Sequence, residues 1–320
     1  MSLLDADVVI VGGAGFIGRA VAATLISKGK SVRIITRKRE RAKLLWTLPR
    51  IEIVEANPND ESELYNAFEN AAAVVNLVGV LHSKPGKPWG PDFDAAHVKL
   101  PARIARCMTR QKIRRLVHIS ALGAADQAPS MYLRSKAAGE AALRTNQNID
   151  LTILRPSVVF GAEDQFMNLF ARLQKFAPIV PLATPHARFQ PIEVRDLAHA
   201  ISTCLDNPAT IGKNYEVVGP DVLTLYELVH WAGVYAGCAR PIIPLPDSIA
   251  WMQAWVMENL PGRPLLSRDN LASASVPNVG SAPMSPDLGI EHPMSIHAVA
   301  PTYLGRDSPR GKLLDRRGKT

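Results

Sequence analysis

The chain has 320 residues, 47% of them hydrophobic, which is enough for one large core or for a core with a smaller lobe. Charged residues make up 21% and aromatic residues 6%, as in ordinary globular proteins, and no apolar run is long enough to cross a bilayer. The net charge is +8, but there is no recognisable nucleic-acid-binding motif, so we expect no nucleic-acid partner; an anionic membrane surface or an acidic protein explains the excess as well.

The first half of the chain alternates apolar runs of strand length with amphipathic stretches of helix length. The apolar runs start with "DVVIVGG" at 7–13 and end with "DLTILRPSVVFG" at 150–161. Helices are expected from Phe16 to about Lys28, from about Lys38, from near Asp60, from about Asp92 and around Tyr132. This alternation predicts an α/β fold with a Rossmann-like, doubly wound parallel sheet.

After about Gly161 prolines become frequent and the strand-like runs become short. Helices are expected at roughly 193–206, 224–237 and 247–260. We therefore predict a dinucleotide-binding domain at 1–160 and a smaller C-terminal α/β lobe, interleaved with the sheet edge, at 161–304. The basic segment 305–320 is expected to be a mobile tail.

The N-terminus and the cysteines predict a cytoplasmic protein. The run "MSLLDADVVIVGGAGF" has no basic segment before its apolar residues, so it predicts a first strand rather than a signal peptide. Cys107, Cys204 and Cys238 are widely spaced, which predicts reduced thiols and no metal site. Peripheral attachment to the inner face of the membrane is the alternative location.

Three glycines follow the first strand at the mouth of a helix, in the pattern Gly12-x-x-Gly15-x-x-Gly18. Glycine allows the tight turn and lets the backbone approach a pyrophosphate, while the helix N-terminus offers free N–H groups. The strand–loop–helix context predicts a nucleotide site, and the alternative is a glycine-rich turn without a ligand. Cofactor contacts are expected from Gly12, Gly15, Phe16, Ile17, Gly18 and Arg19.

The second strand ends in "ITRKRER", where an acid that bonds the ribose of NAD would be usual. Thr36 and Arg37 occupy that place, and Arg19 could join them. A basic group favours a 2′-phosphate, so we predict NADPH in preference to NAD. The alternative is the solvated start of a basic helix.

Tyr132 and Lys136 stand four residues apart in "MYLRSKAAGE", so a helix places both side chains on one face. A lysine beside a tyrosine can help the phenol to give up its proton. The pair has three interpretations. It is a chance arrangement, a clamp on a bound nucleotide, or a catalytic pair in which Tyr132 is the general acid and Lys136 assists it.

The combined motifs resemble the extended short-chain dehydrogenase/reductase family. They are the glycine triplet, "NLVG" at 76–79, Ser120, Tyr132-x-x-x-Lys136 and "LRPSVVFG" at 154–161. The resemblance implies that Tyr132 is the acid/base, that Lys136 lowers its pKa and holds the nicotinamide ribose, and that Ser120 orients a substrate oxygen. It also implies cofactor contacts at Asn57, Val78, Gly79 and Pro156.

The chain departs from the family pattern at three positions. Ala121 stands where many members have a second Ser or Thr, Asn57 where an Asp often contacts the adenine, and His97 where an Asn often lies on the fourth helix. Together these departures weaken the expectation of ordinary epimerase or dehydratase chemistry.

A narrower resemblance continues to about Leu304 through "FMNLFARL", "RFQPIEVRDLA", "YEVVGP" and "APTYL". It is to the branch of atypical short-chain dehydrogenases that contains the nucleotide-binding accessory subunit of respiratory complex I and its bacterial relatives. It implies a tightly held NADPH with a structural role and a respiratory membrane complex as partner. The alternative function is an NADPH-dependent oxidoreductase or epimerase that uses Tyr132, Lys136 and Ser120.

The stretch "DSIAWMQAWVMENLPG" at 247–262 predicts a helix that is too short to span a bilayer. Trp251 and Trp255 lie one turn apart beside Met252, Val256 and Met257. Stripes of Trp and Met usually belong to a core, which favours a helix that packs the smaller lobe. The other interpretation is a helix lying in a membrane interface.

Overall fold

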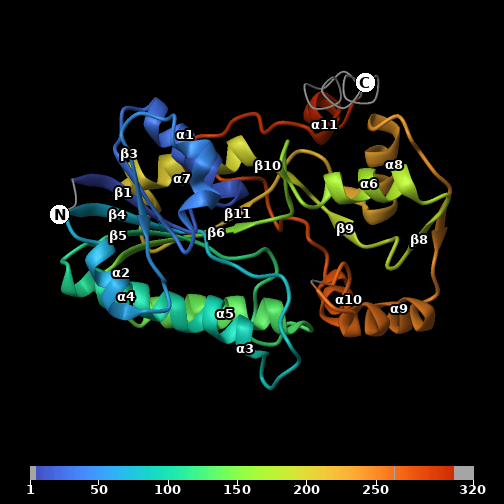
Figure 1. The fold of residues 1–320 in the computed structure, drawn as a ribbon, viewed down its shortest axis with the longest axis horizontal. Helices are drawn as coiled ribbons and strands as arrows, with labels where there is room; N and C mark the ends of the chain where they lie inside the picture. The colour runs from blue at the N-terminus through green and yellow to red at the C-terminus, as the bar shows by residue number, and fades with distance from the viewer. Residues whose placement is uncertain (1–4, 263, 306–320) are drawn as a thin grey trace. The chain divides into compact units, whose positions relative to one another are not determined.

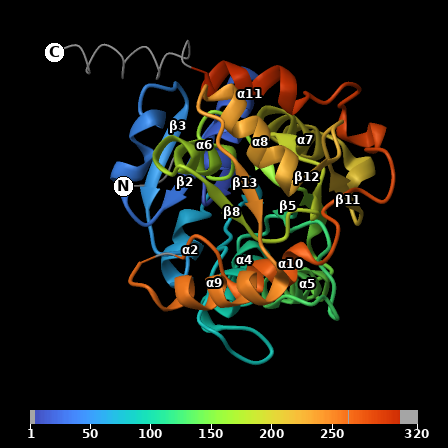
Figure 2. The ribbon, with the colours of Figure 1, turned by 90° about the vertical axis from the view of Figure 1, so that its right-hand side faces the viewer.

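The computed structural model describes residues 5–262 and 264–305, and Figures 1 and 2 show it from two directions. The chain forms two compact units. The first runs to Pro156 and also takes in Arg195–Val217 and Pro283–Glu291; the second takes in Ser157–Val194, Val218–Ala282 and the residues from His292 on. The division predicted at residue 160 stays a prediction, and of the predicted tail 305–320 only Gly305 lies within the described residues.

The first unit is built on a parallel sheet of seven strands. In chain order these are β1 (Ala6–Val11), β2 (Val32–Thr36), β3 (Ile51–Glu55), β4 (Ala71–Asn76), β5 (Arg115–Ile119), β6 (Asp150–Pro156) and β11 (Asn214–Val217). Their order across the sheet is β11-β6-β5-β4-β1-β2-β3, and every neighbouring pair is parallel. The predicted doubly wound α/β fold is confirmed.

Helices cover both faces of this sheet, which is why its central strands are mostly apolar. On one face lie α1 (Phe16–Ser27) and α7 (Val194–Asp206), and on the other lie α2 (Glu61–Ala67), α4 (Leu100–Arg110) and α5 (Met131–Arg144) (Figure 1). Asp60 caps α2 and Ser130 caps α5 through bonds from backbone N–H groups. These helices match the stretches predicted from hydrophobic periodicity.

Two helical stretches of the first unit differ from the sequence prediction. The basic segment after β2, expected as a helix from about Lys38, is a 3₁₀-helix, η1 (Arg39–Leu45). The helix expected from about Asp92 starts with the short α3 (Pro91–Phe93) and a π-helical turn, η2 (Asp94–Lys99), before α4. Short π-helical turns inside α-helices occur frequently at functional sites.

The strand order reverses between β1 and β4, because the chain builds outward from β1 to β3 on one side and from β4 to β6 on the other. In open α/β sheets, ligands bind beyond the carboxyl ends of the strands at such a reversal. The loops that follow β1, β4 and β5 at this edge, together with the first turns of α1 and α5, contain most of the predicted site residues.

In its described residues, the second unit is made of short strands and five helices. Its strands are β7 (Val159–Phe160), β8 (Val180–Leu182), β9 (Arg188–Phe189), β10 (Ile192–Glu193), β12 (Leu223–Thr224) and β13 (Ile242–Pro244). Its helices are α6 (Met167–Phe176), α8 (Leu225–Tyr235), α9 (Asp247–Asn259), α10 (Arg268–Ala274) and α11 (Ile296–Leu304). The helices predicted at roughly 193–206, 224–237 and 247–260 are confirmed as α7, α8 and α9.

The core of the second unit lies where α6, α8 and α11 pack together (Figure 2). Phe160, Met167, Leu228 and Ile296 are its largest buried side chains. Helix α9 contributes only Ala250 and Ala254 to the buried set, so the prediction that its tryptophans belong to a core is wrong. Among the described residues, no helix is long and apolar enough to cross a membrane.

Candidate functional site

The glycine loop between β1 and α1 has the geometry that the sequence predicts. Gly12 has a φ of +86°, a left-handed conformation that favours glycine, and a Cβ there would lie 3.1 Å from the side chain of Val78. A Cβ on Gly18 would come within 2.4 Å of the Cα of Gly13, so this glycine lets α1 pack directly on the turn.

The start of α1 is open to an anion. Gly15 is the N-cap and has no side chain to bond the first N–H groups, and the first turn, with the partly buried Phe16 and Ile17, carries no acidic residue. The N–H groups and the positive end of the helix dipole therefore remain available to a phosphate. Arg19 donates from Nη1 to the carbonyl of Ala14 at 2.7 Å, and so braces the loop.

Arg37 and Asn57 are brought together at the ends of β2 and β3. They line a shallow pocket of about 560 Å³ with Glu55, Glu63 and their neighbours. Arg37 is exposed, and among the described residues its guanidinium has no hydrogen-bonded or ion-paired partner. The carboxylate of Glu55 accepts from the N–H of Arg39, and that of Glu63 from the N–H of Asn57. Within the described part of the chain, this pocket is therefore lined by one guanidinium without a bonded partner and by two carboxylates.

The loop after β4 is fixed by Asn76, the last residue of the strand. Its buried side chain accepts from the N–H of Val78 at 3.1 Å and contacts Nδ1 of His118 at 3.0 Å. Gly79, the next residue, is exposed, and a Cβ placed on it would lie 3.2 Å from Nζ of Lys136. This glycine therefore lets the lysine side chain reach the floor of the site.

Lys136 is buried in α5, with 5% of its surface exposed. Its Nζ donates to the carbonyl of Ile119, the last residue of β5, at 3.2 Å. Burial lowers the pKa of Lys136 to about 8, an effect that the charge of Glu140 partly opposes. A buried ammonium at the carboxyl end of β5 is thus held in place before any ligand binds.

Tyr132 lies one turn before Lys136 on the same helix. Its ring packs against Phe93 and His97, with ring centroids 6.0 and 5.5 Å away. Burial raises the pKa of Tyr132 to about 12. The phenol therefore stays protonated near neutral pH and can donate a hydrogen bond.

His97 is the residue whose role the sequence did not predict. Its Nε2 accepts from the N–H of Val80 at 3.0 Å, so the proton of the neutral ring is on Nδ1. Nδ1 donates to the hydroxyl of Ser135 at 2.8 Å, and that hydroxyl donates to the carbonyl of Tyr132 at 2.7 Å. His97 thereby ties the loop after β4 to the helix that carries Tyr132.

The neutral state of His97 is secure, because burial and the nearby charge of Lys136 lower its pKa to about 2. Close packing makes the connection possible: a Cβ on Gly139 would lie 1.9 Å from the carbonyl oxygen of His97. The substitution of His97 for the usual Asn was visible in the sequence, but its two hydrogen-bond partners, Val80 and Ser135, lie in separate segments of the chain.

Ser120 and Pro156 complete the set of predicted residues. Ser120 directly follows β5 and is 3% exposed, and its hydroxyl has no hydrogen-bond partner within the described part of the chain. The carbonyl of Pro156, at the end of β6, accepts from the N–H of Leu122 at 3.0 Å. A buried hydroxyl without a partner is uncommon and suggests that a ligand completes it.

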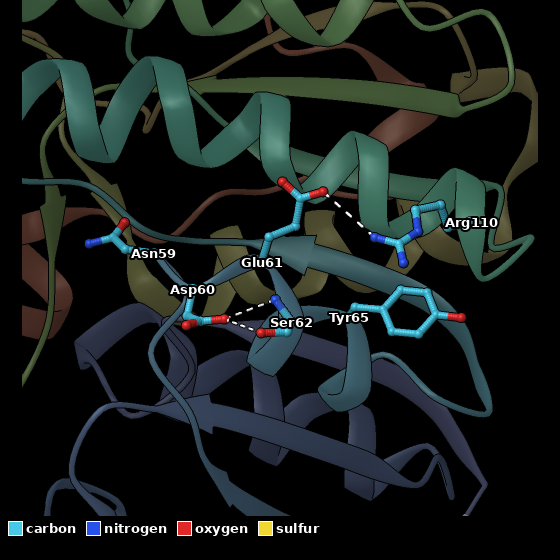
Figure 3. A pocket seen from close by; sticks show the side chains of 6 residues that line it. All are labelled: Asn59, Asp60, Glu61, Ser62, Tyr65 and Arg110. Atoms are coloured by element: carbon cyan, nitrogen blue, oxygen red, sulfur yellow. Dashed lines mark hydrogen bonds and ion pairs between the residues drawn. The ribbon is translucent and has the colours of Figure 1, made fainter.

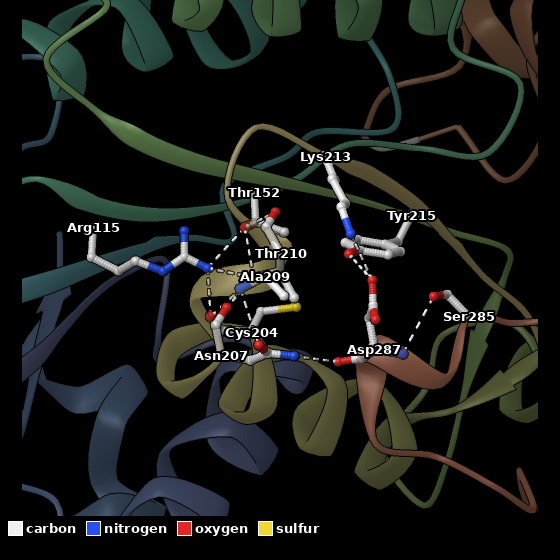
Figure 4. A network of polar contacts seen from close by, with 10 residues as sticks. All are labelled: Arg115, Thr152, Cys204, Asn207, Ala209, Thr210, Lys213, Tyr215, Ser285 and Asp287. Carbon is white, nitrogen blue, oxygen red and sulfur yellow. Dashed lines mark hydrogen bonds and ion pairs between the residues drawn. The ribbon is translucent and has the colours of Figure 1, made fainter.

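Two other polar regions of the first unit contain none of the predicted site residues. The hollow in Figure 3, about 510 Å³, surrounds the start of α2 and is lined by Asp60, Glu61 and Arg110 among others. In Figure 4 the guanidinium of Arg115 donates to Thr152, Thr210 and the carbonyl of Cys204, which ties β5 and β6 to α7. Among residues 5–262 and 264–305 no cluster of metal-ligating side chains occurs.

Comparison with known proteins agrees with this architecture. Residues 8–218 match the NAD dependent epimerase/dehydratase family, and the chain belongs to it. The chain is also similar to NADH dehydrogenase (ubiquinone) 1 alpha subcomplex subunit 9 of Rattus norvegicus mitochondria, with 29% identity over 296 residues, 88% of this chain and 75% of the relative. The predicted resemblance to the complex I accessory subunit is confirmed.

A further relative and a solved structure represent the enzymes of this fold. Ceramide reductase of Caulobacter vibrioides is 26% identical over 241 residues, 75% of this chain and 74% of the relative. A nucleoside-diphosphate-sugar epimerase from Staphylococcus aureus superposes with a TM-score of 0.71 at 16% identity, over 91% of this chain and 98% of that one. At this identity the structural likeness concerns the fold.

Proposed function

We propose that the protein binds NADP(H) at the carboxyl edge of its parallel sheet and holds it chiefly as a structural cofactor, as part of a respiratory membrane assembly. The observation that carries the proposal is that the ammonium of Lys136, from α5, and the hydroxyl of Ser120 both lie at the carboxyl end of β5. The ammonium is buried beside Gly79, and the buried hydroxyl lacks a partner. The hydroxyl groups of a nicotinamide ribose can accept from the ammonium of Lys136, and can either accept from or donate to the hydroxyl of Ser120.

The preference for NADP(H) rests on Arg37. The guanidinium of Arg37 at the end of β2 attracts a 2′-phosphate, whereas the negative charges of Glu55 and Glu63 in the same pocket oppose this attraction. We expect Arg37→Ala to weaken NADPH binding by about tenfold and to leave NADH binding unchanged. Titration calorimetry measures both, and Arg41→Ala, an exposed arginine outside the pocket, is the control. Equal affinity of the unaltered protein for the two nucleotides would refute the preference.

The structural role rests on the state of Tyr132. A phenol whose pKa is about 12 is suited to donate a hydrogen bond to a ribose hydroxyl, and less suited to exchange protons during turnover. The similarity to a subunit of NADH dehydrogenase supports an assembly role, whereas a location on the inner face of the membrane stays a prediction. Co-migration of the protein with a respiratory complex on native gels tests this role, and its absence from every membrane complex would oppose it.

The second candidate function is that of an NADPH-dependent oxidoreductase or epimerase. Ser120 favours it, because the same buried hydroxyl can orient a substrate oxygen, and the relatives of this chain include an enzyme, ceramide reductase. In this function Tyr132 is the acid/base, and Lys136 lowers the pKa of Tyr132 and holds the nicotinamide ribose. Substrate-dependent oxidation of NADPH that is lost in Tyr132→Phe would establish it.

A further inference from the structure

The titratable groups close to the ammonium of Lys136 are neutral. Burial and the charge of Lys136 lower the pKa of His97 to about 2 and that of His118 to about 3, so neither ring is protonated near neutral pH. Tyr132 keeps its proton, because burial raises its pKa to about 12. The hydroxyl of Ser120 does not ionise. Of these five side chains, only that of Lys136 carries a charge at neutral pH.

The carboxylate that acts on this ammonium is already bonded to other cations. It belongs to Glu140, one turn further along α5, whose charge partly opposes the effect of burial on Lys136. The buried carboxylate of Glu140 accepts from Nε of Arg155 at 2.8 Å and pairs with Arg144 at 3.6 Å. The charge of Glu216 on β11 also acts on Arg155. Three cations therefore share two carboxylates, and the charge of Lys136 is only partly compensated.

The reduced and oxidised forms of the nicotinamide differ by one charge. The ring of NADP⁺ is positively charged and the ring of NADPH is neutral, whereas the phosphate groups are the same in both. The ring is joined directly to the ribose that we expect Lys136 to bond, so only the width of one sugar separates the ring from the ammonium. Two like charges this close in a buried site repel each other, and salt screens them little.

We propose that Lys136 makes the site selective for the reduced nucleotide, so that NADPH binds more tightly than NADP⁺. The inference rests on the proposed function, because it takes the nicotinamide ribose to lie beside Lys136. A cation within about 4–6 Å changes the equilibrium of a charged group by about tenfold to a thousandfold. NADPH should therefore bind about tenfold more tightly or better, and a tenfold preference makes the reduction potential of the bound couple about 30 mV more positive.

The test is equilibrium dialysis of the full chain, as purified, against an excess of NADPH and NADP⁺ at equal concentrations and pH 7. Dialysis continues for several times the exchange time of the bound nucleotide, and the nucleotide held by the protein is then identified after denaturation. The ratio of the two bound forms equals the ratio of their affinities. We expect about ten or more molecules of bound NADPH for each molecule of bound NADP⁺.

Variants at two positions assign the preference to the charge of Lys136. Lys136→Met removes the charge and should leave about equal amounts of the two bound forms, whereas Lys136→Arg keeps a cation and should keep the preference. Glu140→Gln removes the opposing carboxylate and should raise the ratio further. The matched control is Arg37→Ala, which should weaken both forms equally, because both carry the 2′-phosphate. Thermal melting checks that each variant is folded.

Equal binding of the two forms by the unaltered protein, or tighter binding of NADP⁺, would overturn this inference and leave the proposed structural role intact. A preference that survives unchanged in Lys136→Met would also overturn it, because another group would then be responsible. If Lys136→Met binds neither form, Glu140→Gln decides, and a ratio that does not rise in that variant refutes the inference. Binding of neither form by the unaltered protein would instead contradict the proposed function itself.

Discussion

The substitution Lys136→Met should make the nucleotide-free protein more stable at neutral pH. Burial lowers the pKa of this lysine from 10.5 to about 8, so keeping it charged at pH 7 costs the folded state roughly 3 kcal/mol. Methionine has a similar length and carries no charge. It also removes the donor to the carbonyl of Ile119, which costs about 1 kcal/mol. The expected net gain is about 2 kcal/mol.

The two pKa values determine how the stability difference between the variant and the unaltered protein changes with pH. The unfolded lysine keeps its proton up to about pH 10.5, and the folded one only to about pH 8. Between these values the unfolded state binds more protons, so the unaltered protein gains stability as the pH rises. The advantage of Lys136→Met should therefore be complete below pH 8 and should disappear by about pH 10.5.

Urea unfolding of nucleotide-free protein at pH 7 and at pH 10 measures the difference, with Lys43→Met as an exposed control that should stay within about 0.5 kcal/mol. The same Lys136→Met protein should lose nucleotide affinity. The ammonium of Lys136, which destabilises the nucleotide-free fold, is the group that we expect to bond the nicotinamide ribose. A variant that is no more stable at pH 7, or a difference that does not change with pH, would refute this reasoning.

Three other substitutions test neighbouring contacts, each by denaturant unfolding. Ser120→Ala should raise stability by up to about 1 kcal/mol, because the buried hydroxyl lacks a partner, and a loss of more than 1 kcal/mol would mean that it is satisfied. Gly139→Ala should cost about 3 kcal/mol or more through its clash with the carbonyl of His97, although Gly→Ala in a helix usually stabilises; a gain would contradict the packing. Glu140→Gln should cost about 3 kcal/mol because it leaves the guanidinium of Arg155 without its carboxylate, and a neutral effect would show that the ion pair is dispensable.

The predictable part of the site consists of local motifs. A left-handed Gly12 and a close-packed Gly18 follow from one short loop, and the shared face of Tyr132 and Lys136 follows from helical spacing. Because parallel strands end at one edge, Ser120 and the loop after β4 could also be placed near them.

The parts that could not be predicted depend on contacts between distant segments. The hydrogen bonds of His97 depend on Val80 in the loop after β4 and on Ser135 in α5. They also depend on a π-helical turn that no periodicity in the sequence indicates. Similarly, the spacing of Trp251 and Trp255 shows that they share a side of α9, but not that the alanine stripe faces inward. Which stripe is buried depends on the space that the rest of the unit leaves, and small side chains fit where large ones do not.

The central claim is that the protein holds NADP(H) as a structural cofactor, and the most direct measurement is made on the purified protein as isolated. The protein is denatured, any released nucleotide is identified, and its exchange against excess labelled NADPH is timed in the native protein. We expect about one NADP(H) per chain that exchanges over hours, because a structural cofactor need not leave. Release of NAD, no bound nucleotide, or exchange within seconds would contradict the account, and fast exchange of NADPH would favour an enzyme.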